Sequence, residues 1–237
     1  DVDAIVAQLK YELYEGITAN DIQRALIMVV RSMIERDPAY SKLACRLLLD
    51  RMYREVFGKN FDRENPQKAQ AEVFARNIRN AVARGDLDTR MAEFDLEKLG
   101  AALVLENDTL FEYMGLEIMA SRYCMEDVET KKQLETPQML WMRTAMGLAL
   151  NEKPEDRERV VMEFYEVLSN FYYTPGGRTL FQSGARKAQL SNCFLNVVPD
   201  SLDGIFKSFS DNSQYLKWSG GTGTSWSKVR ATGSYIK

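Results

Sequence analysis

The chain has 237 residues, of which 31 are lysine or arginine and 34 are aspartate or glutamate, and its formal net charge is −3. We expect no nucleic-acid or membrane partner, because proteins that bind either broadly usually carry a basic excess. Hydrophobic residues at 45% and charged residues at 27% are typical of globular proteins and exclude a disordered or fibrous chain. The length predicts one large or two smaller domains, and no run of about 18 apolar residues predicts a membrane-spanning helix.

The chain contains no histidine. This absence excludes, for the chain alone, imidazole-based catalytic triads, zinc sites with histidine ligands and histidine proton shuttles. Cys45, Cys124 and Cys193 are far apart and form no Cys-x-x-Cys pair, so we expect neither a metal site nor a local redox pair. Few cysteines, odd in number, suit a reducing compartment, and we expect a cytoplasmic protein. The first residue is Asp1 and no helix-ending signal precedes Lys237, which favours a piece of a longer protein.

The first 170 residues have helical periodicity. Thr18 and Asp21 form a capping-box pattern, with aspartate in place of glutamate, before apolar residues at helical spacing. Asp37 before Pro38 predicts a second helix start, and the polar residues 58–66 predict a connection. Further helices are predicted over residues 69–82, 96–106, 137–150 and 156–171. Together these elements predict an all-helical domain over residues 1–170.

The composition changes near Thr174, after which Pro, Gly, Ser and Thr become frequent. The rest of the chain predicts a strand, a helix with Asp200 as its N-cap, a glycine-rich break and a second strand. These elements occupy residues 191–198, 201–217, 220–223 and 224–229. Strand, crossover helix and strand form a βαβ unit. We therefore predict an α+β protein in which residues 171–237 begin an α/β domain that lacks most of its strands.

Two glycine-rich segments and one cysteine could contact a ligand. Residues 176–180 read Gly-Gly-Arg-Thr-Leu, whose bare backbone N–H groups could hold phosphate, although the segment alone also fits a tight turn with a surface arginine. Residues 219–223 permit close approach of a ligand, but they match neither the standard phosphate-binding loop nor the dinucleotide fingerprint. Cys193 lies in the predicted strand, where a lone cysteine is usually a small buried hydrophobe.

Taken together, five segments in order resemble the catalytic (large) subunit of ribonucleotide reductases. They share Thr-Leu-Phe before a glycine, a Leu-Ser-Asn-Cys-Phe strand, Asp-Ser-x-x-Gly-Ile, a Gly-Gly-x-Gly turn and Arg-Ala-x-Gly-Ser-Tyr-Ile with that family. They occupy residues 175–184, 189–195, 200–205, 217–223 and 229–236. In the helical part, residues 13–17, 37–44, 113–115 and 135–143 also resemble the family, so the similarity covers nearly the whole chain.

The resemblance implies a fold and a reaction. The fold is the family's N-terminal all-helical domain followed by the first βαβ part of a ten-stranded α/β barrel, here truncated. In the reaction, a thiyl radical takes the 3′-hydrogen of a ribonucleotide, the 2′-hydroxyl is replaced by hydrogen, and two further cysteines form a disulfide. By position, Cys193 resembles the first cysteine of this reducing pair, a role that thiol chemistry permits. The other two cysteines belong on later strands, so we expect this chain alone to be inactive.

The resemblance also implies two nucleotide sites. Substrate contacts are implied at four residues, namely Gly177, Thr179, Asn192 and Gly221. Many family members have Ser/Thr-Pro-Thr-Leu at residues 177–180, so here position 177 keeps only backbone N–H donation. A regulatory deoxynucleoside triphosphate or ATP at a homodimer interface is implied at Asp200, Ser201, Leu202, Lys217 and Arg230. Lys217 and Arg230 would pair with phosphates, and Asp200 would accept from the sugar hydroxyl. The helix over residues 201–217 would form part of the two-fold contact.

The source of the radical leaves two classes open. Residues 230–236 and 113–115 favour the oxygen-dependent class, in which a metal-bearing small subunit supplies the radical. Residues 175–178 and 191–193 favour the adenosylcobalamin-dependent class. In both, the resemblance implies a thioredoxin- or glutaredoxin-type reductant and no cofactor on this segment. The alternatives outside these classes are a non-catalytic nucleotide-binding or assembly module, and one chain of a split enzyme that needs its C-terminal remainder.

Overall fold

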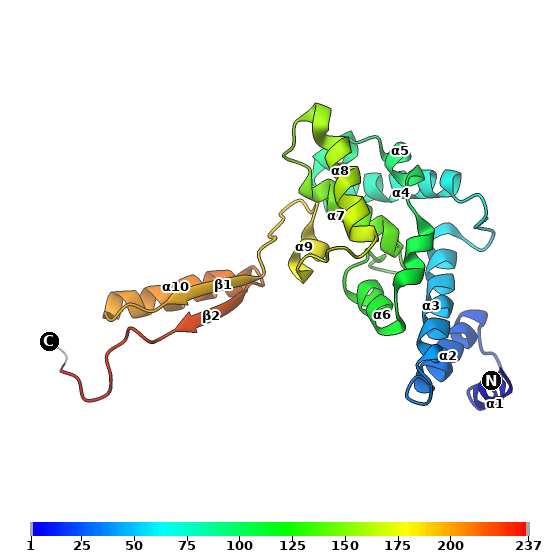
Figure 1. The fold of residues 1–237 in the computed structure, drawn as a ribbon, viewed down its shortest axis with the longest axis horizontal. Helices are drawn as coiled ribbons and strands as arrows, with labels where there is room; N and C mark the ends of the chain where they lie inside the picture. The colour runs from blue at the N-terminus through cyan, green and yellow to red at the C-terminus, as the bar shows by residue number, and fades with distance from the viewer. Residues whose placement is uncertain (1, 236–237) are drawn as a thin grey trace.

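The computed structural model describes residues 2–235, so Ile236, the last residue of the motif at 229–236, lies outside the described residues. Two parts are distinct in Figure 1: a helical body, which we define as residues 2–191, and an arm, residues 192–235, that projects from it. The body contains α1 (Val2–Lys10), α2 (Ala19–Ser32), α3 (Ala39–Phe57), α4 (Gln67–Arg84), η1 (Thr89–Glu93), α5 (Leu96–Ala101), η2 (Leu105–Leu110), α6 (Tyr113–Arg122), α7 (Pro137–Leu148), α8 (Pro154–Ser169) and α9 (Gly177–Gln182). The arm contains β1 (Cys193–Val197), α10 (Leu202–Lys217) and β2 (Gly221–Ser225).

The predicted helix starts in the body are confirmed by their caps. Thr18 accepts a hydrogen bond from the backbone N–H of Asp21 at 3.2 Å, and its hydroxyl donates to the Asp21 carboxylate at 2.7 Å. At the start of α3, the Asp37 carboxylate accepts from the backbone N–H of Ala39 at 2.9 Å. Each side chain therefore satisfies an N–H group that the first helical turn leaves without a partner.

One predicted helix is divided in two. Residues 96–106 were expected to form a single helix, but α5 ends at Ala101 and the short 3-10 helix η2 begins at Leu105. A Cβ atom on Gly100 would lie 2.8 Å from the Cα atom of Ala71, so α5 packs directly on the α4 backbone. Beyond it, the buried Gln70 side chain donates to the Leu103 carbonyl at 3.2 Å. These tertiary contacts, which helical periodicity does not reveal, redirect the chain after α5.

Helix α7 lies in the core of the body, and its residues from Pro137 to Met146 are all buried. Its Arg143 forms an ion pair with Glu135 at 2.6 Å, and both side chains are only 2% exposed. The same guanidinium donates to the carbonyls of Ser183 and Tyr123, at 3.1 Å each. Because an unpaired charge in such a place would be costly, we expect this network to be kept intact, and it joins α7 to the end of α6 and to the end of α9.

The arm contains the predicted βαβ unit. Strands β1 and β2 are parallel neighbours joined by α10, and Cys193 is aligned with Gly221. The second strand, however, was expected over residues 224–229 and instead begins at Gly221. A Cβ atom on Gly223 would lie 2.7 Å from Leu195 Cδ2, so the glycines allow β2 to approach β1. Gly221 and Gly223, which the sequence analysis places in a glycine-rich break, therefore belong to β2.

Helix α10 covers one face of the two-stranded sheet. Phe194 stacks on Tyr215 of α10, with ring centroids 4.5 Å apart, and Asn196 donates to Asn212 at 3.0 Å. Alternate side chains of a strand point to opposite faces, so Cys193 and its neighbours at positions 195 and 197 face away from α10 and are exposed. The N-cap of α10 is Ser201, which accepts from the Gly204 N–H at 3.1 Å, and not Asp200 as expected.

Candidate functional site

The predicted substrate residues Gly177, Thr179 and Asn192 meet where the body joins the arm. The backbone N–H of Arg178 donates to the Asn192 side-chain oxygen at 2.9 Å. A Cβ atom on Gly176 would lie 2.0 Å from Asn192 Nδ2, so only glycine leaves space for the amide there. Thr179 donates its hydroxyl to the Leu190 carbonyl at 3.3 Å. Residues 176–179 are the N-cap and the first three residues of α9, and we call them the substrate loop after the role predicted for them.

The departure from the family pattern at Gly177 has a steric explanation. A Cβ atom at this position would lie 2.8 Å from the hydroxyl oxygen of Tyr123. A serine or threonine side chain at position 177 would therefore displace the tyrosine, whose backbone carbonyl is held by Arg143. Glycine and Tyr123 fit one another in this chain, and the Tyr123 hydroxyl lies beside the loop. Sequence reasoning did not identify Tyr123, because no local pattern marks it.

Cys193 and Gly221 stand next to this loop. Gly221 donates its backbone N–H to the Asn192 carbonyl at 2.9 Å and is aligned with Cys193 across the two strands. The Cys193 thiol is exposed on the sheet face opposite α10. The four predicted substrate residues and the predicted redox cysteine are therefore brought together at one end of the arm.

The other two cysteines have a different environment. Cys45 is buried in α3, and its thiol donates to the Phe111 carbonyl at 3.4 Å. Burial raises the pKa of Cys45 to about 11, and burial raises the pKa of Cys124 well above its usual range. Both thiols are thus kept protonated and inaccessible, whereas thiol exchange needs an accessible thiolate. Among the described residues, Cys193 alone is an exposed cysteine.

Four of the five predicted effector residues lie together at the opposite end of the arm. Asp200, Ser201, Leu202 and Arg230 line a cavity of about 310 Å³, together with residues 231–234. Arg230 Nε donates to the Asp200 carboxylate at 2.8 Å, and Arg230 Nη1 donates to the Tyr235 carbonyl at 2.8 Å. The cavity thus combines an arginine, a carboxylate and backbone groups of residues 231–234.

Lys217, the fifth predicted effector residue, is not part of this cavity. It is the last residue of α10, whereas Leu202 is the first. Sixteen helical residues span about 24 Å at 1.5 Å per residue, so within one chain Lys217 lies far from Arg230. The structure brings it instead to the end of the arm that carries Cys193.

Arg178 was not singled out from the sequence as a functional residue. Its guanidinium donates to the carbonyls of Trp218 at 2.9 Å and Ser219 at 3.1 Å, which end α10. The signal available in the sequence was its position between Gly177 and Thr179, two predicted substrate residues. The partners, 40 residues further along the chain, could not be read from any spacing.

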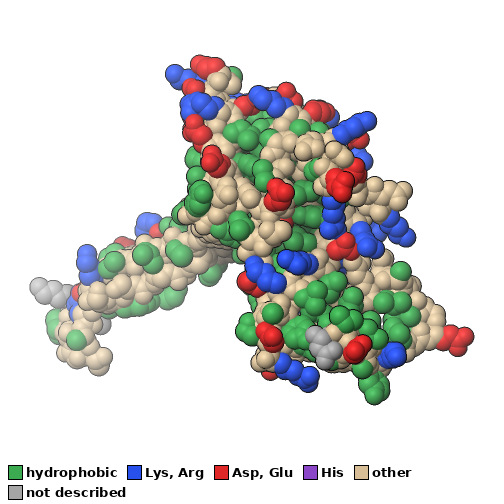
Figure 2. Space-filling model, turned by 45° about the vertical axis from the view of Figure 1, so that its right-hand side comes forward, with side chains coloured by type: hydrophobic (Ala, Val, Ile, Leu, Met, Phe, Trp, Pro, Cys, Tyr) green, Lys and Arg blue, Asp and Glu red, His purple; other side chains and the backbone are tan. Residues whose placement is uncertain are grey.

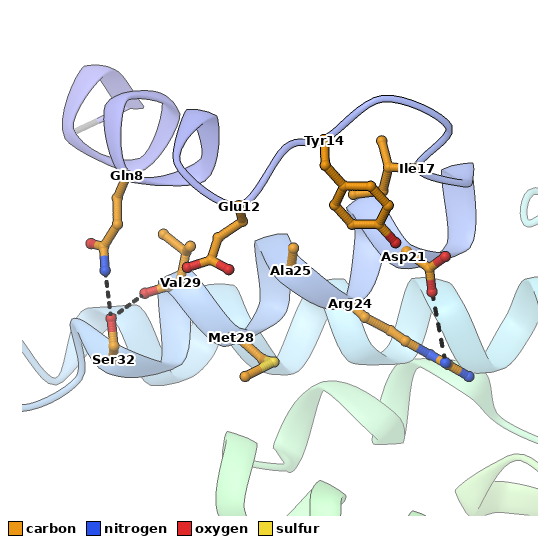
Figure 3. Close-up of a pocket in the computed structure, with 10 residues that line it drawn as sticks. All are labelled: Gln8, Glu12, Tyr14, Ile17, Asp21, Arg24, Ala25, Met28, Val29 and Ser32. Atoms are coloured by element: carbon orange, nitrogen blue, oxygen red, sulfur yellow. Dashed lines mark hydrogen bonds and ion pairs between the residues drawn. The ribbon is translucent and has the colours of Figure 1, made fainter.

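A separate cavity of about 410 Å³ lies between α1 and α2 in the body (Figure 3). Ile17, Ala25 and Val29 contribute apolar side chains to it, and Glu12, Asp21 and Arg24 contribute charged ones. None of the predicted site residues lines this cavity. In the described part of the chain, no three potential metal-ligating side chains cluster, and none of its helices is both long and apolar enough to cross a bilayer.

The comparisons with known proteins agree on one family. The ribonucleotide reductase all-alpha domain matches residues 109–188, and the ribonucleotide reductase barrel domain matches residues 191–237, together more than half of the chain. The ribonucleoside-diphosphate reductase subunit alpha of Chlamydia trachomatis is 43% identical over 94% of this chain and 21% of that protein. The Helicobacter pylori (strain 26695) subunit alpha is 34% identical over 96% of this chain and 28% of that protein. The vaccinia virus large subunit is 27% identical over 94% of this chain and 28% of that protein.

The fold is therefore a helical domain that leads into the opening βαβ unit of an α/β barrel. The chain belongs to the ribonucleotide reductase large-subunit family. It spans between about a fifth and just over a quarter of the length of these relatives.

Proposed function

We propose that the chain is part of the catalytic subunit of a ribonucleoside-diphosphate reductase, which makes deoxyribonucleotides for DNA synthesis. The observation that carries this proposal is the exposed thiol of Cys193, aligned with Gly221 and adjacent to the substrate loop. The family membership supports the reaction class, and the names of the relatives, ribonucleoside-diphosphate reductases, support a diphosphate substrate.

In the proposed reaction, Cys193 is one of two thiols that supply two electrons and two protons. The carbon–oxygen bond at the 2′ position breaks, the oxygen leaves as water, and a carbon–hydrogen bond forms in its place. The two thiols become a disulfide, so one ribonucleotide and two thiols yield one deoxyribonucleotide, one disulfide and one water. A thioredoxin- or glutaredoxin-type protein then reduces the disulfide by thiol exchange. The second thiol and the radical cysteine come from the C-terminal remainder of the enzyme.

The substrate loop and Asn192 have distinct proposed roles. Gly177 and Thr179 would receive the substrate phosphates, because the first N–H groups of α9 have no partner within the helix. Asn192 and Gly221 would contact the ribose, because both are neighbours of Cys193. Asn192 precedes it in the sequence, and Gly221 is aligned with it across the two strands. The hydrogen bond between Arg178 and Asn192 holds the two groups of contacts in one arrangement before the substrate arrives.

We propose that the radical is generated by a separate metal-bearing small subunit. The relatives are named as alpha or large subunits, which supports a multi-subunit enzyme. The alternative is adenosylcobalamin as the radical source. The test is reduction by the complete large subunit with either its small subunit or adenosylcobalamin alone, and turnover with adenosylcobalamin and no second protein would contradict the proposal.

The cavity at the tip of the arm is the proposed effector site for a deoxynucleoside triphosphate or ATP. Arg230 is held by Asp200 and the Tyr235 carbonyl, which orients its guanidinium for a charge-assisted bond to phosphate. Ser201 and Leu202 line the same cavity. Arg230→Ala should weaken effector binding by about 1.5–3 kcal/mol, and unchanged affinity would contradict the assignment.

A homodimer would bring Lys217 into this site. Figure 2 shows hydrophobic side chains along the arm, and in α10 Leu202, Phe206 and Phe209 are exposed by 74%, 68% and 54%. In a two-fold interface the same patch of both copies meets itself, so two antiparallel α10 helices would place Lys217 of each copy near Arg230 of the other. Lys217→Ala should then weaken effector binding in the dimer, and a complete enzyme that stays monomeric with effector would contradict this assignment.

The most direct test of the function is Cys193→Ser in the complete enzyme. We expect the loss of multiple-turnover reduction, because serine cannot form the disulfide. Cys45→Ser and Cys124→Ser are matched controls from the body. Each should keep the wild-type rate of multiple-turnover reduction per folded enzyme molecule. Near-normal turnover of Cys193→Ser with a thioredoxin-type reductant would remove Cys193 from the mechanism.

We further propose that residues 1–170 form the helical domain and residues 171–237 the beginning of the barrel, and that the enzyme is cytoplasmic. The exposed face of β1, with Leu195 at 85% and Val197 at 48% exposure, supports a barrel whose later strands cover it. If the two domains pack as one unit in the complete enzyme, limited proteolysis should not cut the chain between residues 170 and 171. Rapid cleavage there would show that the two domains are joined by an exposed linker.

A further inference from the structure

Helix α9 begins without a cap of its own. Its N-cap residue is Gly176, which has the extended backbone usual at this position but no side chain to accept a hydrogen bond. In α2, by contrast, the N-cap Thr18 accepts from the N–H group of Asp21. Because a helix leaves its first N–H groups without an internal partner, an acceptor for those of α9 must come from elsewhere.

Asn192, the first residue of the arm, supplies this acceptor. Its side-chain oxygen Oδ1 accepts from the backbone N–H of Arg178 at 2.9 Å, across 14 residues of chain. Arg178 is the second residue of α9, and the second or third N–H group is the one that an N-cap side chain normally binds. A Cβ atom on Gly176 would lie 2.0 Å from Nδ2 and 2.9 Å from Cγ of Asn192. The Asn192 amide thus takes the place of a capping side chain at position 176.

The same hydrogen bond fixes the direction of the amide. A backbone N–H can only donate, so the atom of Asn192 that meets Arg178 must be the oxygen and not the nitrogen. The nitrogen Nδ2 has no hydrogen-bond partner within residues 2–235, the described part of the chain. It lies beside Gly176 and is left as a donor for the proposed substrate contact. The oxygen and the nitrogen of this amide therefore have separate tasks, which substitutions can distinguish.

The backbone of Asn192 is bonded to the opposite strand. Its carbonyl accepts from the N–H of Gly221 at 2.9 Å, and the next residue, Cys193, is aligned with Gly221 across the two strands. Asn192 thus binds α9 through its side chain and β2 through its carbonyl, and it is covalently joined to the predicted redox cysteine. A displacement of Asn192 relative to α9 would change the separation between the substrate loop and the Cys193 thiol.

We propose that Asn192 is a positioning residue for the reduction. As the cap that Gly176 cannot provide, it holds the substrate loop at the separation from the Cys193 thiol that the reaction needs. This role rests on the proposed function, because it requires the loop to receive the phosphates of the nucleotide whose ribose meets the cysteine. A nucleotide bound by its phosphates then presents its ribose to the thiol in one arrangement, and such positioning accelerates a reaction.

Two substitutions separate the oxygen of the amide from its nitrogen. Both are made in the complete large subunit, with the radical source that supports wild-type turnover. Asn192→Asp keeps an acceptor for Arg178 but loses the donor, so the dissociation constant of ribonucleoside diphosphate should rise while the single-turnover rate at saturation is kept. Asn192→Ala loses both groups, and its single-turnover rate should fall about 10- to 100-fold. A group that only binds the ribose would change the affinity and not the rate at saturation.

A third variant distinguishes positioning from helix capping alone. Gly176→Ser would collide with the amide of Asn192, but in the Asn192→Ala background the space is free and the serine hydroxyl can accept from Arg178. The double variant Gly176→Ser/Asn192→Ala therefore has a cap within α9 but no side-chain bond from α9 to Asn192. It should bind ribonucleoside diphosphate more tightly than Asn192→Ala, whereas its single-turnover rate should stay low. If Asn192→Ala does not fold, the double variant replaces it in the comparison with Asn192→Asp.

Asn170→Ala is the matched control. This asparagine also binds the end of a helix, because its side chain donates to the Glu166 carbonyl of α8 at 2.9 Å, but it is not one of the predicted site residues. Its single-turnover rate should equal that of the wild type.

Three results would overturn the positioning role of Asn192. They are a wild-type rate in Asn192→Ala, an equal loss of rate in Asn192→Asp and Asn192→Ala, and a return of the wild-type rate in the double variant. A wild-type enzyme that reduces no ribonucleotide in any reconstitution contradicts the proposed function instead, so the two failures are distinguishable.

Discussion

In the helical body Leu48 and Met52 are fully buried, whereas in the arm Leu195 and Leu202 expose 85% and 74% of their surface. The polar groups differ in the same way: the Arg143–Glu135 ion pair is buried, and the Arg230–Asp200 pair is 40% and 34% exposed. The body has a closed core, while the arm presents exposed apolar side chains and a partly exposed ion pair. The difference teaches that the candidate chemistry lies in the part of the chain that leaves apolar surface uncovered, as expected if later strands of the proposed barrel pack on it.

The largest effect on stability should come from breaking the buried ion pair. Arg143→Met leaves the Glu135 carboxylate buried without its partner, which should lower the free energy of unfolding by about 3–5 kcal/mol. Urea denaturation monitored by the fluorescence of the buried Trp141 measures it. The control is Arg159→Met, because Arg159 is 60% exposed in its ion pairs and its loss should cost about 1 kcal/mol or less. Equal costs for the two variants would refute the contrast.

The same leucine-to-alanine substitution in the two regions compares a buried position of the body with an exposed position of the arm. Leu48→Ala should cost about 2–5 kcal/mol, because it opens a cavity in the body. Leu195→Ala should change the stability of the 237-residue chain by about 0.5 kcal/mol or less, as is usual for exposed positions. Thermal and urea unfolding of both variants provide the comparison. A cost above 2 kcal/mol for Leu195→Ala would show that the arm is packed in solution.

A pH effect should also be confined to the body. Asp108 is fully buried and accepts from Tyr53 at 2.6 Å and from Gln138 at 2.8 Å, and burial raises the pKa of Asp108 to about 7. A carboxyl whose folded pKa is raised stabilises the fold when protonated, so this contribution is lost as the pH rises from about 4 through 7.

Between pH 5 and pH 8 the free energy of unfolding should therefore fall by about 3 kcal/mol from this group alone. Asp108→Asn stays neutral, can still accept from Gln138, and would donate its amide N–H to the Tyr53 hydroxyl instead of accepting from it, so it should remove this part of the pH dependence. Urea denaturation of the wild type and the variant at both pH values checks the sign. Parallel pH profiles for the two proteins would contradict the assignment to Asp108.

A steric effect of similar or smaller size concerns the packing of α7 against the residues that follow α9. A Cβ atom on Gly147 would lie 2.1 Å from the Gly184 nitrogen, whereas one on Gly115 would meet Phe111 at 3.6 Å, an ordinary contact. Gly147→Ala should therefore cost about 1–3 kcal/mol through overpacking. Gly115→Ala, within a helix, should be neutral or stabilise by up to about 1 kcal/mol. Equal melting temperatures for both variants would show that α7 and residues 183–184 pack less closely than described.

The features that the sequence predicted correctly depend on local chemistry. Thr18 and Asp37 marked helix starts because a cap is made within three residues, and the βαβ unit followed from a strand, an amphipathic helix and a second strand in order. The end of the predicted helix at 106 and the start of β2 were wrong, because both are decided by glycines that meet backbone or side chains from elsewhere.

The candidate site was partly accessible by resemblance and partly hidden. Asn192, Cys193 and Gly221 were named from motifs, and the structure brings them together. Arg178 and Tyr123 were missed, since their contacts join segments 40 and 54 residues apart. The Arg178 contacts depend on the packing of the body against the arm and the Tyr123 contact on packing within the body, and neither leaves a periodic pattern in the sequence.

A single-turnover experiment tests the role of Cys193 most directly. The complete enzyme is fully reduced, freed of external reductant, allowed to react with ribonucleoside diphosphate and small subunit, and then alkylated for peptide mass spectrometry. We expect the amount of deoxyribonucleotide formed to equal the amount of Cys193 that can no longer be alkylated because it has entered a disulfide. Cys45 and Cys124 should be alkylated to the same extent before and after the reaction. Product formed while Cys193 stays fully alkylatable would contradict the account.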